Sequence, residues 1–265
     1  EERTGLDYAS TQRAVSDDGV DVAVMHACGH DVHVTCLLGA CAALAEDRTT
    51  WSGTVLAVFQ PAEEKGTGAQ AMIEDGLFSR FPTPVVVLGQ HVAPLPAGVI
   101  GLRSGPTFAA ADTLRITLHG QGAHGSRPEA SVDPVVMAAA TVMRLQTIVS
   151  REVGGAETAV VTVGTIHAGS AANIIPADAE LVLNVRTFTD DVRTRVIEAI
   201  GRIARAEAAA SGAPREPDTE PLNSFPAVVN DPDAVERTRA ALQAAAGFVV
   251  DPGSITGSED VGMLA

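Results

Sequence analysis

The sequence is poor in positive charge and nearly lacks lysine. Its 265 residues include 18 basic and 33 acidic side chains, which gives a formal net charge of −15, and Lys65 is the single lysine. A chain this acidic repels phosphate backbones and anionic lipid headgroups. We therefore expect neither a nucleic acid nor a membrane surface among its partners.

Long apolar runs and a disulfide framework are also missing. No hydrophobic segment is long enough to span a bilayer, and no signal-peptide pattern opens the chain. The three cysteines, Cys28, Cys36 and Cys41, form an odd set within one short stretch. Such a set is a poor basis for disulfides and favours a reducing compartment, so we expect a cytoplasmic protein.

The two ends of the sequence indicate a fragment. It begins with EERTGLDYAS, without an initiator methionine, and it stops at GSEDVGMLA without a closing structural element. We therefore expect the chain to be part of a longer protein.

The first hundred residues have the pattern of an α/β sheet. Apolar residues from Val34 to Ala45 have the spacing of one helix face. The continuous apolar runs at 53–59 and 84–91 predict strands buried on both faces, and residues 68–77 between them predict a short helix closed by Gly76. Strand, helix and strand in this order predict a mixed, largely parallel sheet with flanking helices.

After about Gly105 the pattern changes to strands with one wet face. Apolar and polar residues alternate in 112–120 and again in 179–188, and residues 158–166 predict another strand. Asp133 and Pro134 suit the start of a helix that runs to about Val149, and Thr189 or Asp190 suits the start of the next.

This order of elements, β-α-β-β-α, predicts a smaller α+β domain with two helices on one face of its sheet. We expect a first part of a catalytic domain at 1–105, the smaller domain at 106–222, and the continuation of the catalytic domain at 223–265, with a helix at 232–246.

One stretch concentrates ligands for a transition metal. MHACGHDVHV, at 25–34, contains three histidines, a cysteine and an aspartate. Cys28 and His30 are two residues apart, so both can point to one side of a turn. A thiolate and an imidazole suit zinc, and also iron, cobalt or manganese when carboxylates complete the coordination.

Two further polar clusters follow the predicted buried strands. Glu63 and Glu64 come after the first strand, and His91 comes at the end of the second. Ligands of open α/β sheets bind beyond the carboxyl ends of strands, so we expect these clusters to converge. Adjacent glutamates favour a division of labour, in which one binds metal and the other remains a base for a metal-activated water.

Several motifs together resemble the amidohydrolase branch of the M20 metallopeptidase family, which includes hippurate hydrolases, N-acyl amino acid amidohydrolases and auxin-conjugate hydrolases. They occur in order along nearly the whole chain: MHACGHDVH, FQPAEE, GQH, GQGAHGSRPEASVDPV, NIIPADAELVLNVRTF and GSEDVG. The resemblance implies a two-metal catalytic domain interrupted by a smaller ferredoxin-like lid domain that often dimerises. It also implies hydrolysis of the amide bond in small N-acyl amino acids.

The resemblance assigns roles to individual residues. It implies two divalent ions, with zinc or manganese expected and cobalt or nickel as alternatives. Glu63 would be the general base, and His124, from the partner subunit of a homodimer, would stabilise the oxyanion and contact substrate. Asn173 and Arg186 would bind the substrate, and Arg186 would pair with the carboxylate of the substrate. The implied metal ligands are Cys28, which would bridge the ions, His30, Glu64 and His91.

The sequence departs from the family pattern at three points. The family's last metal ligand is a histidine that would lie beyond Ala265, the N-terminal strand region expected before EERTGLDYAS is missing, and Val261 stands where relatives usually have phenylalanine. The missing histidine leaves open whether this chain is active.

Other interpretations of the same residues remain. Cys28 could belong to a redox or metal-sensing thiol protein, although Cys36 and Cys41 fall into a helix pattern and neither suits a resolving cysteine. The chain could also be a dipeptidase or carboxypeptidase of the same superfamily, or a fragment that binds metal without turnover. Among the remaining polar residues of the chain, we expect His26, Asp31 and His33 to orient neighbours, and His119 and His167 to be structural or surface residues.

Overall fold

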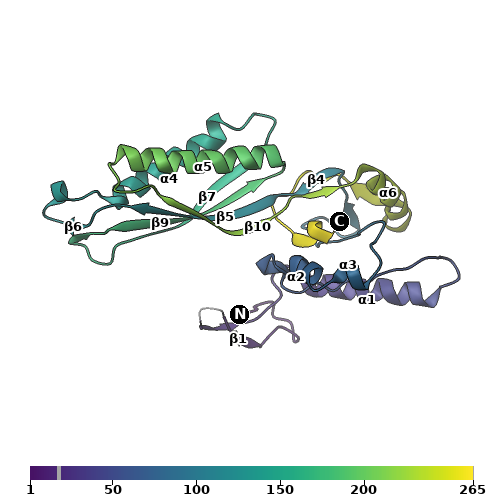
Figure 1. Cartoon of the computed structure of the whole chain (residues 1–265). Helices are drawn as coiled ribbons and strands as arrows, with labels where there is room; N and C mark the ends of the chain where they lie inside the picture. The colour runs from purple at the N-terminus through teal and green to yellow at the C-terminus, as the bar shows by residue number, and fades with distance from the viewer. Residues whose placement is uncertain (17–18, 265) are drawn as a thin grey trace. The chain divides into compact units, whose positions relative to one another are not determined.

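The computed structural model describes residues 1–16 and 19–264, which form two compact units (Figure 1). The first unit comprises residues 1–60 and 83–96, and the second comprises residues 61–82 and 97–265. Each unit is described by itself.

The first unit contains a small hairpin and one long helix. Strands β1 (Arg13–Val15) and β2 (Asp21–Ala23) pair antiparallel, and helix α1 spans His30–Glu46. The indole of Trp51 donates a hydrogen bond to the carbonyl of Leu44 at 3.0 Å, which ties the following segment to the helix. The helix predicted from Val34 is confirmed, and it begins four residues earlier than its apolar face indicated.

The prediction of two buried strands in the first unit is wrong. Residues 53–59 and 84–91 belong to no strand among those that the structure describes. Val55, Phe59 and Leu88 remain 54%, 47% and 72% exposed. A parallel strand needs hydrogen-bonded neighbours and cover on both faces, and the described part of this unit supplies neither to these segments.

The largely parallel sheet is therefore also a wrong prediction for this structure. The largest sheet in the described residues is antiparallel, and the two-stranded parallel pair joins β3 (Val99–Gly101) to β12 (Phe248–Val250) in the second unit. The fold is nevertheless a mixed α/β structure with parallel and antiparallel pairing.

The second unit is organised around a four-stranded antiparallel sheet. Its strand order is β10 (Asp218–Phe225), β5 (Ala110–His119), β9 (Asp178–Thr187) and β7 (Ala159–Ala168). Figure 1 shows helices α4 (Pro134–Arg151) and α5 (Asp190–Ala210) along one face of this sheet. The predicted two helices on one face are present.

Alternation along the strands places the core between sheet and helices. Leu114, Ile116 and Leu118 of β5 point into this core, while the residues between them are partly exposed. Both helices begin at the predicted caps, since the Asp133 carboxylate accepts from the amide of Val135 at 2.8 Å and the Thr189 hydroxyl accepts from the amide of Val192 at 3.4 Å.

Strand β10 was not predicted. It pairs antiparallel with the edge of β5, and a register shift lies between Pro221 and Asn223. Proline is tolerated in an edge strand because the position of its missing N–H can face solvent. The proline-rich composition of this segment therefore did not indicate a strand, and pairing with β5 stabilises it.

Short elements complete the second unit, and the predicted helix at 232–246 is confirmed as α6. None of the helices that the structure describes is long and apolar enough to cross a membrane. The elements not yet named are η1 (Glu63–Lys65), α2 (Gly68–Glu74), α3 (Leu77–Arg80), β4 (Gly105–Phe108), β6 (Ala123–His124), η2 (Pro128–Ala130), β8 (Ile174–Ile175), β11 (Val228–Asn230), α6 (Pro232–Ala246) and η3 (Asp260–Leu264).

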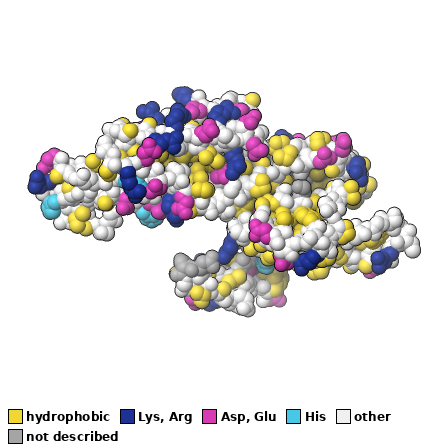
Figure 2. Space-filling view, viewed as in Figure 1, with side chains coloured by type: hydrophobic (Ala, Val, Ile, Leu, Met, Phe, Trp, Pro, Cys, Tyr) yellow, Lys and Arg dark blue, Asp and Glu magenta, His cyan; other side chains and the backbone are white. Residues whose placement is uncertain are grey.

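A partly buried ion pair joins three elements of the sheet domain. The Nε and Nη2 atoms of Arg193 on α5 each donate to the Asp112 carboxylate of β5 at 2.7 Å, and Nη2 also donates to Ser224 on β10 at 3.0 Å. Asp112 is 4% exposed, and the hydrogen bond to it raises the pKa of Arg193. Figure 2 shows further basic and acidic side chains intermingled over the helices of this domain. Two further ion pairs join α5 to the segment that follows α4, Arg195–Glu157 at 2.8 Å and Arg202–Glu152 at 2.6 Å.

Thr187 provides a test of the core. Its side chain is fully buried, and its hydroxyl has no hydrogen-bond partner in the described part of the chain. We predict that Thr187→Val raises the free energy of unfolding by about 1 kcal/mol, because it removes an unsatisfied buried hydroxyl at nearly constant shape. The measurement is equilibrium unfolding in urea.

The matched control is Thr141→Val. Thr141 is equally buried, but its hydroxyl donates to the carbonyl of Met137 at 2.9 Å, so this substitution should lower the free energy of unfolding by about 1 kcal/mol. Equal losses in the two variants would contradict the interpretation of Thr187.

Candidate active site

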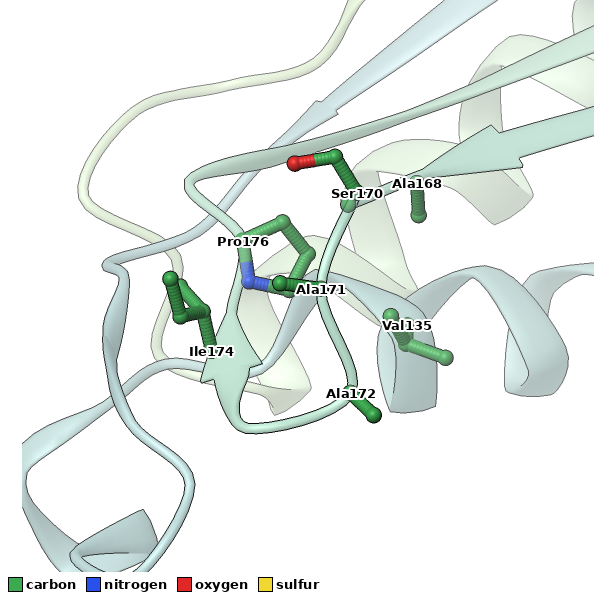
Figure 3. A pocket seen from close by; sticks show the side chains of 8 residues that line it. Val135, Ala168, Ser170, Ala171, Ala172, Ile174 and Pro176 are labelled. Carbon is green, nitrogen blue, oxygen red and sulfur yellow. The ribbon is translucent and has the colours of Figure 1, made fainter.

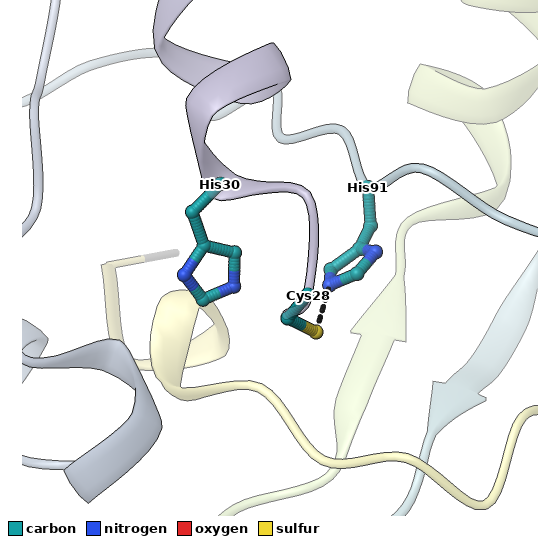
Figure 4. A group of neighbouring side chains, drawn as sticks. All are labelled: Cys28, His30 and His91. Carbon is teal, nitrogen blue, oxygen red and sulfur yellow. Dashed lines mark hydrogen bonds between the residues drawn. The ribbon is translucent and has the colours of Figure 1, made fainter. Parts of the chain in front are cut away.

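The first unit brings together three of the predicted metal ligands. Cys28 and His30 flank the turn at the start of α1, and His91 comes from the separate segment 83–96 (Figure 4). The ligand atoms of these three side chains all lie within 4.8 Å of one another. Cys28 Sγ and His91 Nε2 are 3.5 Å apart.

The hydrogen bond of His91 to the backbone leaves Nε2, the ring nitrogen that faces Cys28, available to bind a metal. Its Nδ1 lies 2.7 Å from the carbonyl oxygen of Val92, which can only accept, so Nδ1 carries the proton. Nε2 then presents its lone pair toward Cys28. A backbone carbonyl that holds the second ring nitrogen is the usual support of a metal-bound histidine.

The arrangement fits a transition metal. With bond lengths of about 2.3 Å to sulfur and about 2.05 Å to nitrogen, a tetrahedral ion places these two ligand atoms about 3.6 Å apart. The observed separation of 3.5 Å agrees with this value. A thiol and two imidazoles are also the donors that zinc and its neighbours in the first transition row prefer.

Two neighbours fix the geometry of this cluster. His33 Nε2 accepts the amide N–H of Val92 at 3.0 Å and so holds the segment that carries His91. Burial, followed by the charges of His91 and His30, lowers the pKa of His33, which favours the neutral ring that this acceptor role requires. Gly29 has a φ of +76°, and a Cβ there would lie 2.3 Å from a methyl group of Val92. The glycine therefore permits both the turn and the close approach.

In the second unit, Glu63 and Glu64 occupy a constrained turn, the single-turn helix η1. Residues with left-handed backbone flank it, Ala62 at φ 51° and Gly66 at φ 62°. A Cβ at Gly66 would lie 1.9 Å from the ring of Phe225, the last residue of β10. The strand that the sequence did not predict therefore packs directly against the predicted catalytic turn.

A polar cavity of about 330 Å³ lies between this turn and the wet face of the sheet. Its volume is within the range of small-molecule sites. Arg186 is its basic residue. The lining residues are Glu63, Glu64, Ala111, Thr113, Asn184, Arg186, Asn223, Phe225 and Ser258.

Hydrogen bonds hold the walls of this cavity. Arg186 Nε donates to the Asn184 side-chain oxygen at 3.0 Å, and Nη1 donates to the carbonyl of Thr256 at 2.6 Å. Asn223 Nδ2 donates to the carbonyl of Lys65 at 3.1 Å and so ties β10 to η1. The cavity thus combines carboxylates and a guanidinium on well-supported elements.

The segment 257–260 adds two acidic side chains next to Glu63. Carboxylate oxygens of Glu63, Glu259 and Asp260 lie within 4.8 Å of one another, and buried Asp260 accepts the amide of Ala69 at 3.0 Å. Burial, together with the charge and hydrogen bond of Glu63, raises the pKa of Glu259 to about 8. The raised pKa favours the protonated form of Glu259, which relieves the repulsion in this group.

His124, on β6, and Asn173, the residue before β8, lie together. His124 pairs with Ile174, and the amide of Gly125 donates to the carbonyl of Asn173 at 2.8 Å. His124 Nδ1 accepts the amide N–H of Ser126 at 3.2 Å, so the proton of the neutral ring is on Nε2. The exposed His124 can therefore donate a hydrogen bond through Nε2.

A second cavity has a volume of about 370 Å³, and Figure 3 shows the side chains that line it. Small residues at 168–172, of which Ser170 is polar, line it together with Ile174, Pro176 and Val135 at the start of α4. It contains no titratable side chain and adds no chemistry to the neighbouring His124.

The β6–β8 ribbon, which carries His124, and the cavity that contains Arg186 lie at opposite ends of the sheet. The β6–β8 ribbon continues from the end at which His119 pairs with Asp178, whereas Arg186 lies eight residues farther along β9. At about 3.4 Å per residue, this places Arg186 roughly 27 Å from Asp178. His124 and Arg186 of one chain therefore belong to separate places in the fold.

Two histidines outside these clusters have structural or surface positions, as expected. His119 is 8% exposed, with Nε2 2.8 Å from the Asp218 carboxylate and Nδ1 3.1 Å from Arg215 Nη2. His167 is exposed on β7.

The sequence interpretation did not include Asn184, Asn223, Glu259 and Asp260. The first two come from strands of the sheet, and only the tertiary fold brings them to the cavity. The motif GSEDVG was noticed, but its acidic pair received no role. Its adjacent glutamate and aspartate resembled the Glu63–Glu64 pair and could have indicated another site residue.

Comparison with known proteins agrees with the motifs. The chain is 36% identical to N-acetyl-L-cysteine deacetylase of Bacillus subtilis over 98% of its own length and 59% of that protein, and 42% identical to hippurate hydrolase of Campylobacter jejuni over 71% and 49%. It spans less than two thirds of the length of these relatives.

Among solved structures, the YXEP protein of Bacillus subtilis is described as a dinuclear metal binding peptidase of the M20 family. It matches with a TM-score of 0.79 and 31% identity, over 99% of this chain and 64% of that one. The family model for peptidase family M20/M25/M40 matches residues 1–265. The chain therefore belongs to peptidase family M20/M25/M40.

Proposed function

We propose that this protein hydrolyses the amide bond of N-acyl amino acids in a metal-dependent reaction. The observation that carries the proposal is the cavity that Glu63 shares with Arg186. It combines a carboxylate for proton transfer with a guanidinium for a substrate carboxylate, in a space suited to a small molecule. The deacetylase and hippurate hydrolase that resemble this chain support the same class of substrate.

The residues that would hold two divalent ions are Cys28, His30, His91 and Glu64. Zinc or manganese suits this set best, and cobalt or nickel are alternatives. The three-donor cluster of the first unit supports this assignment. When bound, the ions supply Lewis acidity, which polarises the amide carbonyl and makes an attacking water more acidic.

Glu63 is the proposed general base. Its carboxylate would take the proton of the attacking water and then deliver it to the nitrogen of the leaving amine. The constrained turn between Ala62 and Gly66 supports this role, because it limits the orientations that the side chain can take.

His124, Asn173 and Arg186 are the proposed substrate contacts. The Nε2–H of His124 would donate to the oxygen of the amide carbonyl as negative charge develops there. Arg186 would hold the carboxylate of the amino acid through paired N–H groups, and Asn173 would donate to or accept from the substrate through its side-chain amide.

These contacts lead to a proposed dimer. His124 and Arg186 lie at opposite ends of the sheet in one chain, so a substrate that meets both requires His124 from a second copy. We propose that residues 106–222 form a ferredoxin-like lid and dimerisation domain. Residues 1–105 and 223–265 would form the catalytic domain of a cytoplasmic enzyme.

The surface around β7 supports pairing of two such domains. β7 is an edge strand, and Ile166 on it is 53% exposed. The adjacent helix α4 exposes Val136 and Met143 at 64% and 72%. A second copy would cover both the unpaired strand edge and these apolar side chains.

Glu63→Gln tests the general base. We predict that kcat for N-acetyl amino acids falls by at least about 100-fold, because the amide keeps the shape but cannot accept the proton. Bound metal, measured by elemental analysis, should be retained. Glu64→Gln is the paired variant, and it should lose metal.

Two outcomes would contradict these assignments. The roles of Glu63 and Glu64 are wrong if Glu63→Gln retains most activity and Glu64→Gln retains its metal. The proposed function fails if the wild-type protein cleaves dipeptides but not N-acetyl or N-benzoyl amino acids.

Cys28→Ser tests the metal centre. A hydroxyl is a much poorer metal ligand than a thiolate. Substitution of a residue that only hydrogen-bonds to a metal ligand typically lowers metal affinity about 10- to 100-fold, and we predict a larger loss for Cys28→Ser. Cys36→Ser and Cys41→Ser, on α1 at positions outside the cluster, are the controls and should retain metal. Equal metal content in all three variants would exclude Cys28 as a ligand.

Complementation tests whether His124 acts across a dimer. Glu63→Gln and His124→Ala chains should each be inactive, whereas a heterodimer carries one site with both residues intact. With random exchange in an equal mixture, half of the dimers are mixed and half of their sites are intact, so about a quarter of the wild-type activity should return. No recovery after verified subunit exchange would show that His124 acts within its own chain or not at all.

A further inference from the structure

Arg186 differs in its partners from several other arginines of the second unit. Arg103, Arg193, Arg195 and Arg202 each pair with a carboxylate. Among the described residues, the hydrogen-bond partners of Arg186 are neutral oxygens, those of Asn184 and Thr256. Its positive charge is therefore not compensated by an ion pair.

The two neutral partners fix the plane of the guanidinium. Asn184 holds Nε at 3.0 Å, and the Thr256 carbonyl holds Nη1 at 2.6 Å, so two atoms of the rigid fork are anchored. The Nη2 group has no partner among the described residues. Asn184 and Arg186 are both partly buried, lie on the wet face of β9 and line the same cavity.

We infer that Asn184 is a positioning residue that makes the protein selective for substrates with a free carboxylate. This inference rests on the proposed function. An amide oxygen at this position orients the guanidinium without neutralising it, whereas a carboxylate would compete with the substrate for the same charge. A side chain with no acceptor at position 184 would leave the guanidinium held only through Nη1, so its plane would no longer be fixed and the bidentate geometry would be lost.

The inference predicts a selective effect on binding. Asn184→Ala should raise KM for an N-acetyl amino acid by about 10-fold, the value of one charge-assisted hydrogen bond, and should change kcat by less than about twofold. KM for the corresponding N-acetyl amino acid amide, which lacks the carboxylate, should stay unchanged. Asn184→Asp should raise KM for the carboxylate substrate further, because the new charge pairs with Arg186.

Glu180→Ala is the matched control. Glu180 lies on the same face of β9, but its partner is Arg115 at 3.1 Å and it does not line the cavity. This variant should leave the ratio of KM values for the two substrates unchanged. In an Arg186→Met background, Asn184→Ala should have no further effect on that ratio, since the group that it positions is gone.

A binding measurement separates this inference from the proposed function. Calorimetry of Glu63→Gln protein should give the same selective loss of affinity for the N-acetyl amino acid when Asn184→Ala is added. Hydrolysis by the wild type with equal KM ratios in wild type and Asn184→Ala would overturn the role of Asn184 and leave the proposed function intact. Wild-type protein that neither binds nor hydrolyses N-acyl amino acids would overturn both.

Discussion

The ladder between β5 and β9 is the interaction on which the second unit depends. Its register runs without interruption from Ala110 opposite Thr187 to His119 opposite Asp178. This pairing places alternate side chains in the core beneath α4 and α5, and leaves the opposite face wet. The same face that the helices leave uncovered provides the Asn184 and Arg186 wall of the cavity. Core packing and the candidate site are thus two consequences of one register.

Local sequence patterns predicted the elements that are stabilised locally. The start of α4 followed from Asp133 and Pro134, whose cap and fixed backbone act within one turn. The prediction of strands at 53–59 and 84–91 was wrong because an apolar run becomes a strand only when distant segments of the chain pair with it. Strand β10 was missed because its stability comes from pairing with β5, which its proline-containing sequence does not indicate.

The candidate site shows the same division. Cys28 and His30 share one turn, and their spacing predicted a common cluster that the structure forms with His91. The neighbours that orient the cavity could not be predicted, because Asn184 and Asn223 reach it through sheet pairing with strands far apart in sequence. The motif resemblance supplied the roles of Glu63 and Arg186, whereas the hydrogen bonds of Arg186 are visible only in the fold.

The backbone of Ala62 connects the order of the η1 turn to the integrity of β10. Alanine costs about 1 kcal/mol or more in the left-handed region, so this turn does not hold its shape by its own preference. Two contacts from β10 stabilise it instead. The ring of Phe225 packs against Gly66, and Asn223 donates a hydrogen bond to the carbonyl of Lys65. Release of β10 from the sheet edge would therefore also release Glu63 and Glu64. These segments, far apart in sequence, should open as one cooperative unit in the native ensemble.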